Sequence, residues 1–356
     1  MKIGLCTGGG DCPGLNSIIR AAVRHGIQEY GYEIIGIRDS FNGLMSRPYR
    51  IRPLDLEAVS GILLRGGTIL GTTNAGNPFQ FPTGANKKTC DLSSLVLEAY
   101  KDLGLDAIIA IGGDGTHTIA YELSKLGINM IGVPKTIDND LPEADETVGF
   151  DTAVQVATDA ISRLQSTAES HERIMILEVM GRHTGHIALH AGIAAGAHII
   201  LIPEIPFSYE AILRKIVERR QRGKAFSVIV VAEGSFEAGQ SPLFQSVSAG
   251  KQTLGGIGQH IAQTLSQRHQ IESRVTVLGH VQRGGLPTHR DRILGTMYGV
   301  RSIDMAHRKQ FGKIISRWRG DFHEVEYQKV AGQYREVDKE DVLLGASRSV
   351  GICLGD

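Results

Sequence analysis

The sequence predicts an α/β fold with mainly parallel sheets in two domains, and three observations lead to this prediction. Short runs rich in β-branched residues alternate with helical patterns, which is typical of parallel strands joined by right-handed crossovers. Several of these runs are apolar throughout, as strands covered on both faces must be. The chain has 356 residues, which is too long for a single small core and suits two domains.

The apolar runs predict eight strands. These strands are Ile3–Thr7, Ile34–Ile37, Ala107–Ile111, Met130–Val133, Ile174–Val179, His198–Ile202, Val228–Ala232 and Arg274–Leu278. The clearest helix is predicted at Thr152–Ala168, where apolar residues recur at spacings of three and four. No Ser- or Pro-rich linker divides the chain, and the best domain boundary lies near Gly149, where an Asp-rich loop ends and this helix begins.

The composition bears on location and partners. Lys and Arg together number 38, as do Asp and Glu, so the chain has no net charge. It therefore creates no overall electrostatic attraction for nucleic acid or a membrane surface, and we expect neither partner. No apolar stretch approaches the roughly 20 residues of a membrane helix. The cysteines have neither zinc-site nor disulfide spacing, so we expect small buried side chains in a reducing, cytoplasmic compartment. They are Cys6, Cys12, Cys90 and Cys353.

Glycine-rich loops follow two of the predicted strands. In Gly8–Asn16 and in Ile111–Thr116, glycines let backbone N–H groups face an anion beside a helix N-terminus. The first loop is not a Walker A loop, because no Gly-Lys-Ser/Thr follows. In the second, Asp114 is suited to hold Mg²⁺ beside phosphates. The alternatives are a tight strand-to-helix turn for the first loop and an N-cap Asp for the second.

A third loop, Pro134–Asp140, also follows a predicted strand. Its two carboxylates, Asp138 and Asp140, flank Asn139. This arrangement suits a general base with a supporting partner, and a kinase needs one carboxylate to take the proton of the acceptor hydroxyl. The alternative interpretation is a solvated Asx turn.

Cationic side chains accompany two further strands. Arg182 follows one strand, where a guanidinium can neutralise charge on a transferring phosphoryl group. Arg274 precedes another strand and His280 and Arg283 follow it, which indicates a bound phosphate. The alternatives are exposed arginines in surface ion pairs and a structural histidine. All five motifs stand where parallel sheets bind their ligands, so together they favour a phosphate-handling site.

The five motifs resemble the 6-phosphofructokinase family in order and spacing, from about residue 2 to about residue 310. They read Gly-Gly-Asp-Cys-Pro-Gly-Leu-Asn, Gly-Gly-Asp-Gly-Thr, Pro-Lys-Thr-Ile-Asp-Asn-Asp, Glu-Val-Met-Gly-Arg and Gly-His-Val-Gln-Arg-Gly-Gly. The resemblance implies two three-layer domains with the active site in the cleft between them. Residues 1–149 plus about 281–333 would bind nucleotide, and residues 150–280 plus about 334–356 would bind sugar phosphate.

The resemblance also implies a glycolytic reaction: Mg²⁺-dependent transfer of the γ-phosphate of ATP to the 1-hydroxyl of fructose 6-phosphate, giving fructose 1,6-bisphosphate. Asp114 is similar to the Mg²⁺ residue of the family. The residues implied for the nucleotide are Gly10, Asn74, Ala75, Gly113, Asp114, Gly115 and Thr116. Bacterial relatives read Gly-Ser-Ala-Arg where this chain reads Gly-Thr-Thr-Asn-Ala from Gly71, so one cationic contact is missing or replaced.

For the sugar phosphate, Asp138 looks like the base, and Thr136 and Arg182 are similar to the groups that steady the transferring phosphoryl. The implied substrate-binding residues are Thr136, Ile137, Asp138, Arg173, Met180, Gly181, Arg182, Glu233, Arg274, His280, Val281, Gln282 and Arg283. In the family, Arg173 and Arg274 would reach a neighbouring subunit's site, so a homo-oligomer, dimer or tetramer, is implied. An allosteric enzyme is implied too, with Leu56 and Gln165 standing where relatives carry effector-site Arg.

Two positions bear on the phosphoryl donor. Family members that use pyrophosphate usually carry Asp at the position of Gly115, where a carboxylate would repel the nucleotide, so Gly115 favours ATP. Lys135 is typical of pyrophosphate users, and the pair resembles a mixed-donor subgroup whose Gly-bearing members are mainly ATP enzymes. We predict ATP, with pyrophosphate or ADP as the alternative.

Two rival functions remain for comparison. Gly-Gly-Asp-Gly also occurs in NAD kinases and lipid kinases, which would not need the Thr136–Asp140 motif with a separate Arg and His set. A non-catalytic regulatory subunit would usually lose the base or the metal carboxylate, and this chain has both Asp138 and Asp114. The tail Gly312–Asp356 receives no functional prediction.

Overall fold

The structure, a computed structural model, describes residues 1–83, 88–247 and 251–356. The chain forms two compact units, one of Met1–Thr152 with Arg283–Tyr334 and one of Ala153–Gln282 with Arg335–Asp356. Each unit has its own sheet and is described by itself. Among the helices of the described residues, none combines the length and the apolar character that crossing a membrane requires.

The first unit is built on an eight-stranded sheet with the order β16-β15-β7-β6-β1-β2-β3, and β8 pairs with β7. The strands are β1 (Lys2–Thr7), β2 (Glu33–Ile37), β3 (Ile51–Pro53), β6 (Ala107–Gly112), β7 (Met130–Thr136), β8 (Val148–Gly149), β15 (Lys313–Trp318) and β16 (Asp321–Glu326). Only the edge pairs β2–β3 and β15–β16 are antiparallel within this sheet of the described chain.

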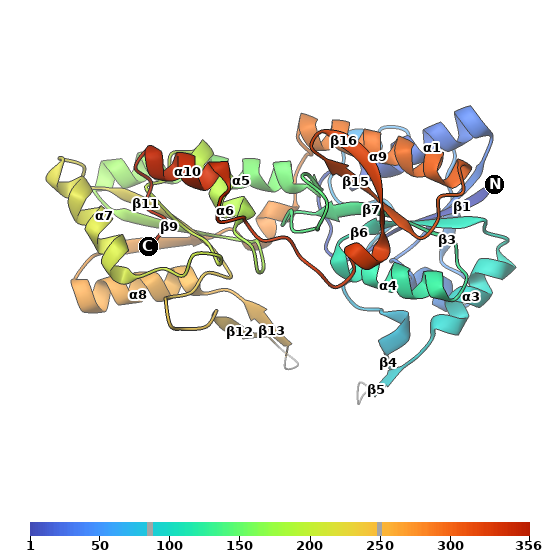
Figure 1. Cartoon of the computed structure of the whole chain (residues 1–356), viewed down its shortest axis with the longest axis horizontal. Coiled ribbons are helices and arrows are strands. Elements are labelled where there is room, and N and C mark those ends of the chain that lie inside the picture. The colour runs from blue at the N-terminus through green and yellow to red at the C-terminus, as the bar shows by residue number, and fades with distance from the viewer. Residues whose placement is uncertain (84–87, 248–250) are drawn as a thin grey trace. The chain divides into compact units, whose positions relative to one another are not determined.

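Helices cover both faces of this sheet, so the first unit has three layers. Helices α1 (Leu15–Tyr30) and α9 (His289–His307) lie on one face, and α3 (Ser93–Asp102) and α4 (Asp114–Lys125) lie on the other (Figure 1). A buried cluster that includes Ile108 and Ala110 packs beneath α3 and α4. The shorter elements are α2 (Asn42–Met45), η1 (Ile62–Leu64), η2 (Pro78–Gln80), η5 (Tyr327–Lys329) and the hairpin of β4 (Phe81–Thr83) and β5 (Lys88–Cys90).

The second unit is built on four parallel strands in the order β10-β11-β9-β14. These strands are β9 (Ile174–Val179), β10 (Ile199–Leu201), β11 (Ser227–Ala232) and β14 (Ser273–Val277). Residues of β9 and β11 are buried along their whole length, since helices cover both faces. A separate antiparallel hairpin joins β12 (Phe244–Val247) to β13 (Lys251–Leu254).

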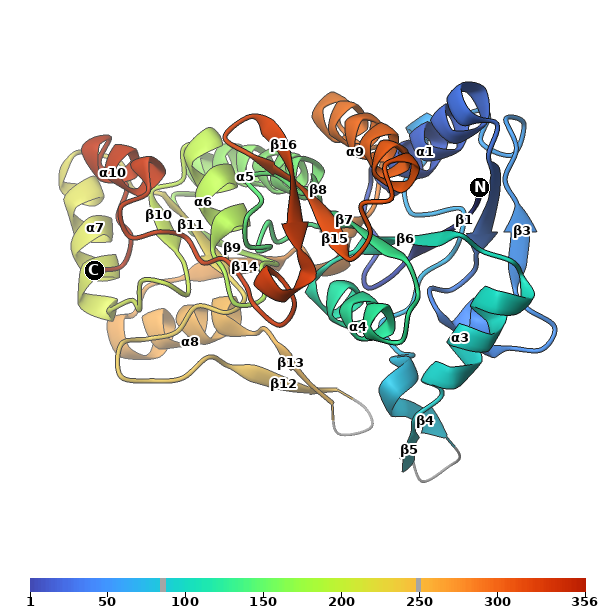
Figure 2. The same cartoon turned by 45° about the vertical axis from the view of Figure 1, so that its right-hand side comes forward.

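Helices α7 (Tyr209–Gln221) and α8 (Ile257–His269) contribute Ile212, Ile216 and Ile261 to a core that also holds Ile176 and Ile229. Helices α5 (Phe150–His171) and α6 (His186–Ala194) lie on the opposite side of the sheet from α8 (Figure 2). Helix α10 (Val342–Ser349) packs beside α6, and the short helix η4 (Gly279–Arg283) follows β14 along the chain.

The predicted α/β fold is confirmed, and all eight predicted strands and the long helix are present, most with bounds within one or two residues. The main difference is β7, which continues through Pro134 to Thr136 because β8 pairs with its end, Lys135 with Val148 and Thr136 with Gly149. The start of the third motif is therefore strand and not loop.

The cysteine expectation is partly wrong. The four cysteines are free, and Cys6 and Cys12 are buried, but Cys90 is exposed and Cys353 is half-buried. Cys90 lies in β5, a short hairpin strand whose residues are all exposed, so no core is available to it.

Candidate active site

The first glycine-rich loop is tied to two other segments of the first unit. The amide of Gly8 donates to the carbonyl of Ile111 (2.9 Å), and the amide of Gly9 donates to the carbonyl of Thr73 (3.1 Å). The hydroxyl of Thr72 donates to the carbonyl of Gly9 at 2.6 Å. The segment Gly71–Ala75, predicted to help bind the nucleotide, therefore lies directly against this loop.

The second loop leads from β6 into α4 and presents one carboxylate. Asp114 is half-buried in the first turn of α4, and its Oδ1 accepts hydrogen bonds from the amide of Gly332 (2.7 Å) and the hydroxyl of Thr118 (3.3 Å). Mg²⁺ in nucleotide sites is usually held by one or two carboxylates together with substrate phosphates. A single partly exposed carboxylate at a helix N-terminus, beside a glycine-rich turn, fits that requirement.

Gly115 follows Asp114, and the space into which a side chain at Gly115 would point is empty. A Cβ built at this position would meet no atom within 4 Å, and the residue is exposed. The chain itself therefore leaves room at the position predicted to decide the phosphoryl donor, and a side chain added there would not strain the fold.

The third motif places two carboxylates around one hydroxyl. The hydroxyl of Thr136 lies 3.4 Å from Oδ2 of Asp138 and 3.3 Å from Oδ1 of Asp140, and it accepts a hydrogen bond from the amide of Asp138 (3.1 Å). Asp138 is only 3% exposed. Asn139 adopts a positive φ of 53° and binds the backbone of Asp145 and Thr147 through its amide side chain. The turn is thus an ordered structure, in contrast to a solvated Asx turn.

The second and third loops are neighbours. Strands β6 and β7 are paired so that Gly112 lies opposite Pro134. A Cβ at Gly113 would lie 3.8 Å from the Cβ of Thr136. The loop that carries Asp114 and the turn that carries Asp138 therefore follow adjacent parallel strands at one edge of the sheet, as ligand sites of such sheets do.

Two cations lie against the first loop. Lys135 is 3% exposed and donates a hydrogen bond to the carbonyl of Gly10, and burial lowers the pKa of its ammonium because the charged form loses hydration. Arg283 donates to the carbonyl of Asp11 (3.2 Å), and a Cβ at Gly10 would come within 2.6 Å of its Nη1. A side chain at position 10 would therefore displace the Arg283 guanidinium that lies over this glycine.

In the second unit, the fourth motif is held by two side chains. The amide of Met180 donates to the Gln282 side chain (2.7 Å), and the amide of Arg182 donates to Oε1 of Glu233 (3.0 Å). The structure thus brings together four predicted substrate residues from three segments of this unit. The Arg182 backbone has a positive φ of 52°, and the residue is exposed.

Arg173 and Arg274 lie at the start of neighbouring strands β9 and β14, and one carboxylate joins them. Oε1 of Glu272 accepts from Nη2 of Arg274 and lies 3.8 Å from Nη2 of Arg173. Both arginine side chains are exposed, by 36% and 53%. Glu272 was not predicted, although its place directly before the strand of Arg274 is visible in the sequence.

The remaining predicted residues are divided between the units. Ile137 is buried in the first unit, whereas His280 and Val281 are exposed in η4 of the second. The sequence analysis did not single out Asp291, which is buried in the first turn of α9. The signal that could have found it is the spacing of Thr288 and Asp291, which is that of a helix-capping box.

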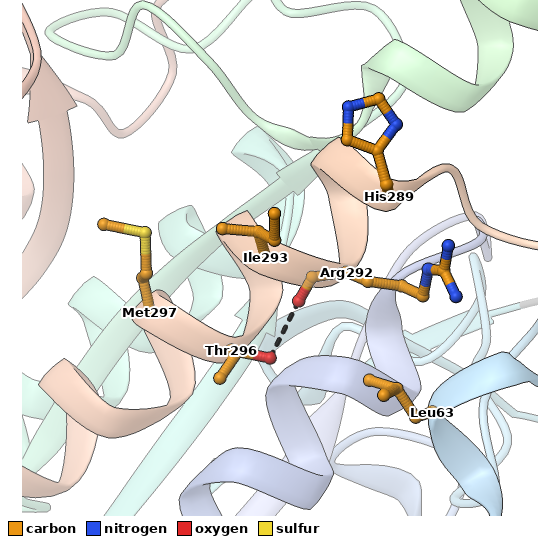
Figure 3. Close-up of a pocket in the computed structure, with 6 residues that line it drawn as sticks. All are labelled: Leu63, His289, Arg292, Ile293, Thr296 and Met297. Carbon is orange, nitrogen blue, oxygen red and sulfur yellow. Dashed lines mark hydrogen bonds between the residues drawn. The ribbon is translucent and has the colours of Figure 1, made fainter.

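The first unit also has an apolar surface cavity of about 330 Å³ that is separate from these residues. Figure 3 shows it beside α9. It is lined by Leu63, His289, Arg292, Ile293, Thr296 and Met297. None of these residues was predicted to bind nucleotide or sugar phosphate.

Comparisons with known proteins show the family of this chain. An ATP-dependent 6-phosphofructokinase of Chloroflexus aurantiacus is 48% identical and covers 100% of this chain and 98% of its own length. A pyrophosphate–fructose 6-phosphate 1-phosphotransferase of Amycolatopsis methanolica is 46% identical and covers 96% of this chain and 97% of its own length. The structure of Pichia pastoris phosphofructokinase matches with a TM-score of 0.80 at 28% identity over 92% of this chain, which spans 35% of that longer chain. Because the family model of phosphofructokinase also matches residues 2–306, the chain belongs to the phosphofructokinase family.

Proposed function

We propose that this chain is an ATP-dependent 6-phosphofructokinase that transfers the γ-phosphate of ATP to the 1-hydroxyl of fructose 6-phosphate. Relatives with this name, 44% and 48% identical, cover the whole chain. The observation that carries the proposal is the turn after β7, where buried Asp138 is bound to Thr136 beside the glycine loop of Asp114. A phosphoryl transfer enzyme needs an acceptor base next to a phosphate cradle.

In the proposed mechanism, Asp138 accepts the proton of the sugar 1-hydroxyl as that oxygen attacks the γ-phosphorus, and the bond from this phosphorus to the bridging oxygen breaks so that ADP leaves. Thr136 orients this carboxylate, since its hydroxyl contacts Oδ2 and also accepts from the Asp138 amide. Arg182 steadies the charge on the transferring group. Met180, Gly181 and Glu233 hold the sugar.

We further propose that the donor site consists of the backbone amides of the first two glycine loops, together with the segment that includes Asn74 and Ala75. Asp114 would hold Mg²⁺, which supplies neutralisation of the phosphate charge when bound. The space around Gly115 supports ATP as the donor. The second candidate is a pyrophosphate-dependent enzyme, favoured by Lys135 and by the Amycolatopsis methanolica relative.

For the 6-phosphate we propose His280, Arg283, Arg173 and Arg274, the last two acting in a neighbouring subunit of a homo-oligomer. Their exposed side chains at the start of β9 and β14 support such a role. The four cysteines are free thiols, which supports the cytoplasmic location that a reducing compartment implies.

A coupled assay with purified protein, Mg²⁺ and fructose 6-phosphate tests the proposal, with ATP, pyrophosphate and ADP supplied in separate reactions. We expect turnover with ATP. The Asp138→Asn variant should fold and lose roughly 100-fold or more in kcat, the usual scale for a positioned base. Turnover of this variant near wild type would refute the assignment of the base, and activity with pyrophosphate alone would establish the second candidate.

A further inference from the structure

Asp291 is a fully buried carboxylate in the first turn of α9, and each of its oxygens has its own partners. Oδ1 accepts a hydrogen bond from the amide of Gly149 at 2.8 Å. Oδ2 accepts from the amide of Thr152 at 2.9 Å and from its hydroxyl at 2.5 Å. One oxygen therefore binds the end of β8, and the other binds the first turn of α5.

The Gly149 contact leads to the turn that carries the proposed base. In the β7–β8 pairing, Gly149 lies opposite Thr136. Two residues earlier, the hydroxyl of Thr147 donates to the Thr136 carbonyl (2.7 Å), and the Thr147 amide donates to Oδ1 of Asn139 (3.0 Å). Segment 147–149 thus contacts both ends of the turn, Thr136 and Asn139. The segment is in turn held by the hydrogen bond from its Gly149 amide to Asp291.

The other side of this segment is closed by the first glycine-rich loop. The thiol of Cys12 donates to the carbonyl of Val148 at 3.4 Å. A Cβ at Gly149, whose φ is 105°, would lie 2.4 Å from the Cys12 sulfur. Segment 147–149 is therefore packed between the first loop, the Thr136–Asn139 turn and the carboxylate of Asp291.

We propose that Asp291 is a positioning residue for phosphoryl transfer, which fixes the Asp138 carboxylate by holding segment 147–149 against the Thr136–Asn139 turn. The inference rests on the proposed function, because it takes Asp138 as the base. A reacting group that is displaced by about 1 Å costs on the order of 100-fold in rate. A shift of the turn would therefore reduce the rate of transfer more than it would reduce binding.

The two oxygens of Asp291 allow the positioning role to be separated from plain helix capping. In the Asp291→Asn variant, one oxygen becomes an NH₂ group that cannot accept. The remaining oxygen will face Thr152, because that site offers two donors and the other offers one. The NH₂ group then faces the Gly149 amide, which loses its acceptor. The variant therefore breaks the hydrogen bond that leads to the turn and keeps the hydrogen bonds to Thr152 in the first turn of α5.

The matched control is Thr152→Val, which keeps the volume of the side chain and removes the hydroxyl. It loses the donation to Oδ2 of Asp291 and the hydrogen bond that the hydroxyl accepts from the Thr288 amide (3.1 Å), and it keeps the hydrogen bond from the Gly149 amide to Asp291. Thr152 has no proposed part in binding or catalysis. Both variants remove buried hydrogen bonds, so both should lower Tm.

Steady-state kinetics with ATP and fructose 6-phosphate, combined with thermal unfolding, tests the proposal. We expect Asp291→Asn to lower kcat by about 10- to 100-fold, with both KM values within about threefold of wild type. Thr152→Val should keep kcat within about twofold despite its lower Tm. Equal kcat losses in the two variants, or an Asp291→Asn kcat within about twofold of wild type, would overturn the proposal.

Hydrogen exchange of the Gly149 and Asp138 amides supplies a readout that does not need turnover. We expect both amides to exchange at least about tenfold faster in Asp291→Asn than in wild type, and unchanged exchange at Asp138 in Thr152→Val. If the wild-type protein did not phosphorylate fructose 6-phosphate, the proposed function would fail while this measurement still decided whether Asp291 holds the turn. Unchanged exchange at Asp138 in Asp291→Asn would contradict the positioning role.

Discussion

The buried ammonium of Lys135 donates a hydrogen bond to the backbone carbonyl of Gly10, which joins the end of β7 to the first glycine-rich loop. Lys135 is 3% exposed, and burial lowers its pKa. A cation at this place both orders the loop and adds positive charge beside a polyphosphate.

We predict that Lys135→Met lowers kcat/KM for ATP by about 10-fold or more, because the Gly10 carbonyl loses its partner and the donor loses a cation. Lys125→Met is the control, since Lys125 is an exposed residue of α4 that pairs with Glu122. Initial rates at varied ATP measure the effect. A Lys135→Met enzyme with wild-type kcat/KM would show that this lysine does not act on the donor.

Gly115 offers a direct test of donor choice. Because a Cβ here meets nothing within 4 Å and a carboxylate is favourable in the first turn of a helix, Gly115→Asp should fold with a Tm near wild type. We expect kcat/KM for ATP to fall about 10- to 100-fold through repulsion of the nucleotide phosphates, and activity with pyrophosphate to fall less. Gly115→Ala, which adds volume without charge, should keep ATP activity. Equal losses with both donors in Gly115→Asp would contradict a role in donor choice.

Arg173 and Arg274 should act on the sugar phosphate alone. Replacing either with Met should raise KM for fructose 6-phosphate by about 10-fold, the cost of one charge-assisted bond to a phosphate, and leave KM for ATP unchanged. Arg268→Met, at an exposed residue near the end of α8, serves as the control. A rise in KM for ATP, or none for fructose 6-phosphate, would count against the assignment.

Acid should destabilise the protein through three histidines. Burial lowers the pKa of His117 and His186 to about 3 and that of His198 to about 4, from an ordinary value of 6.5. Between pH 4 and 6.5 the unfolded chain binds more protons at these residues than the folded chain, so their contribution to stability falls as pH falls. For the buried pair His117 and His186, this contribution changes by at most about 1.4 kcal/mol per pH unit for each residue.

Two buried carboxylates oppose this trend, since burial raises the pKa of Glu204 as well as that of Asp291. Burial raises the pKa of Asp291 to about 6 from 3.8, so below pH 6 its contribution to stability increases on acidification. Three histidines outweigh these two carboxylates, so urea unfolding should give a lower free energy of unfolding at pH 5 than at pH 7. His198→Gln should show a smaller difference. Equal stability of the wild-type protein at the two pH values would rule out this account.

Much of the fold could be predicted because strands covered on both faces are mostly apolar. Strands β6, β9 and β11 are buried along their whole length, and their polar residues are Glu178 and Ser227. The loops after them could be found by their glycines and carboxylates. Strands β15 and β16 were missed, since they form an antiparallel edge whose outer strand is mostly exposed, and their mixed residues give no such run.

The sequence by itself determined the family, the eight predicted strands with the long helix, and the residue types that follow those strands. The tertiary structure alone decided which of these residues touch. The Asp291–Gly149 bond joins residues 142 apart, and the Lys135–Gly10 bond joins residues 125 apart. Such contacts depend on which strands become neighbours and on the register between them, and no spacing along the chain encodes either.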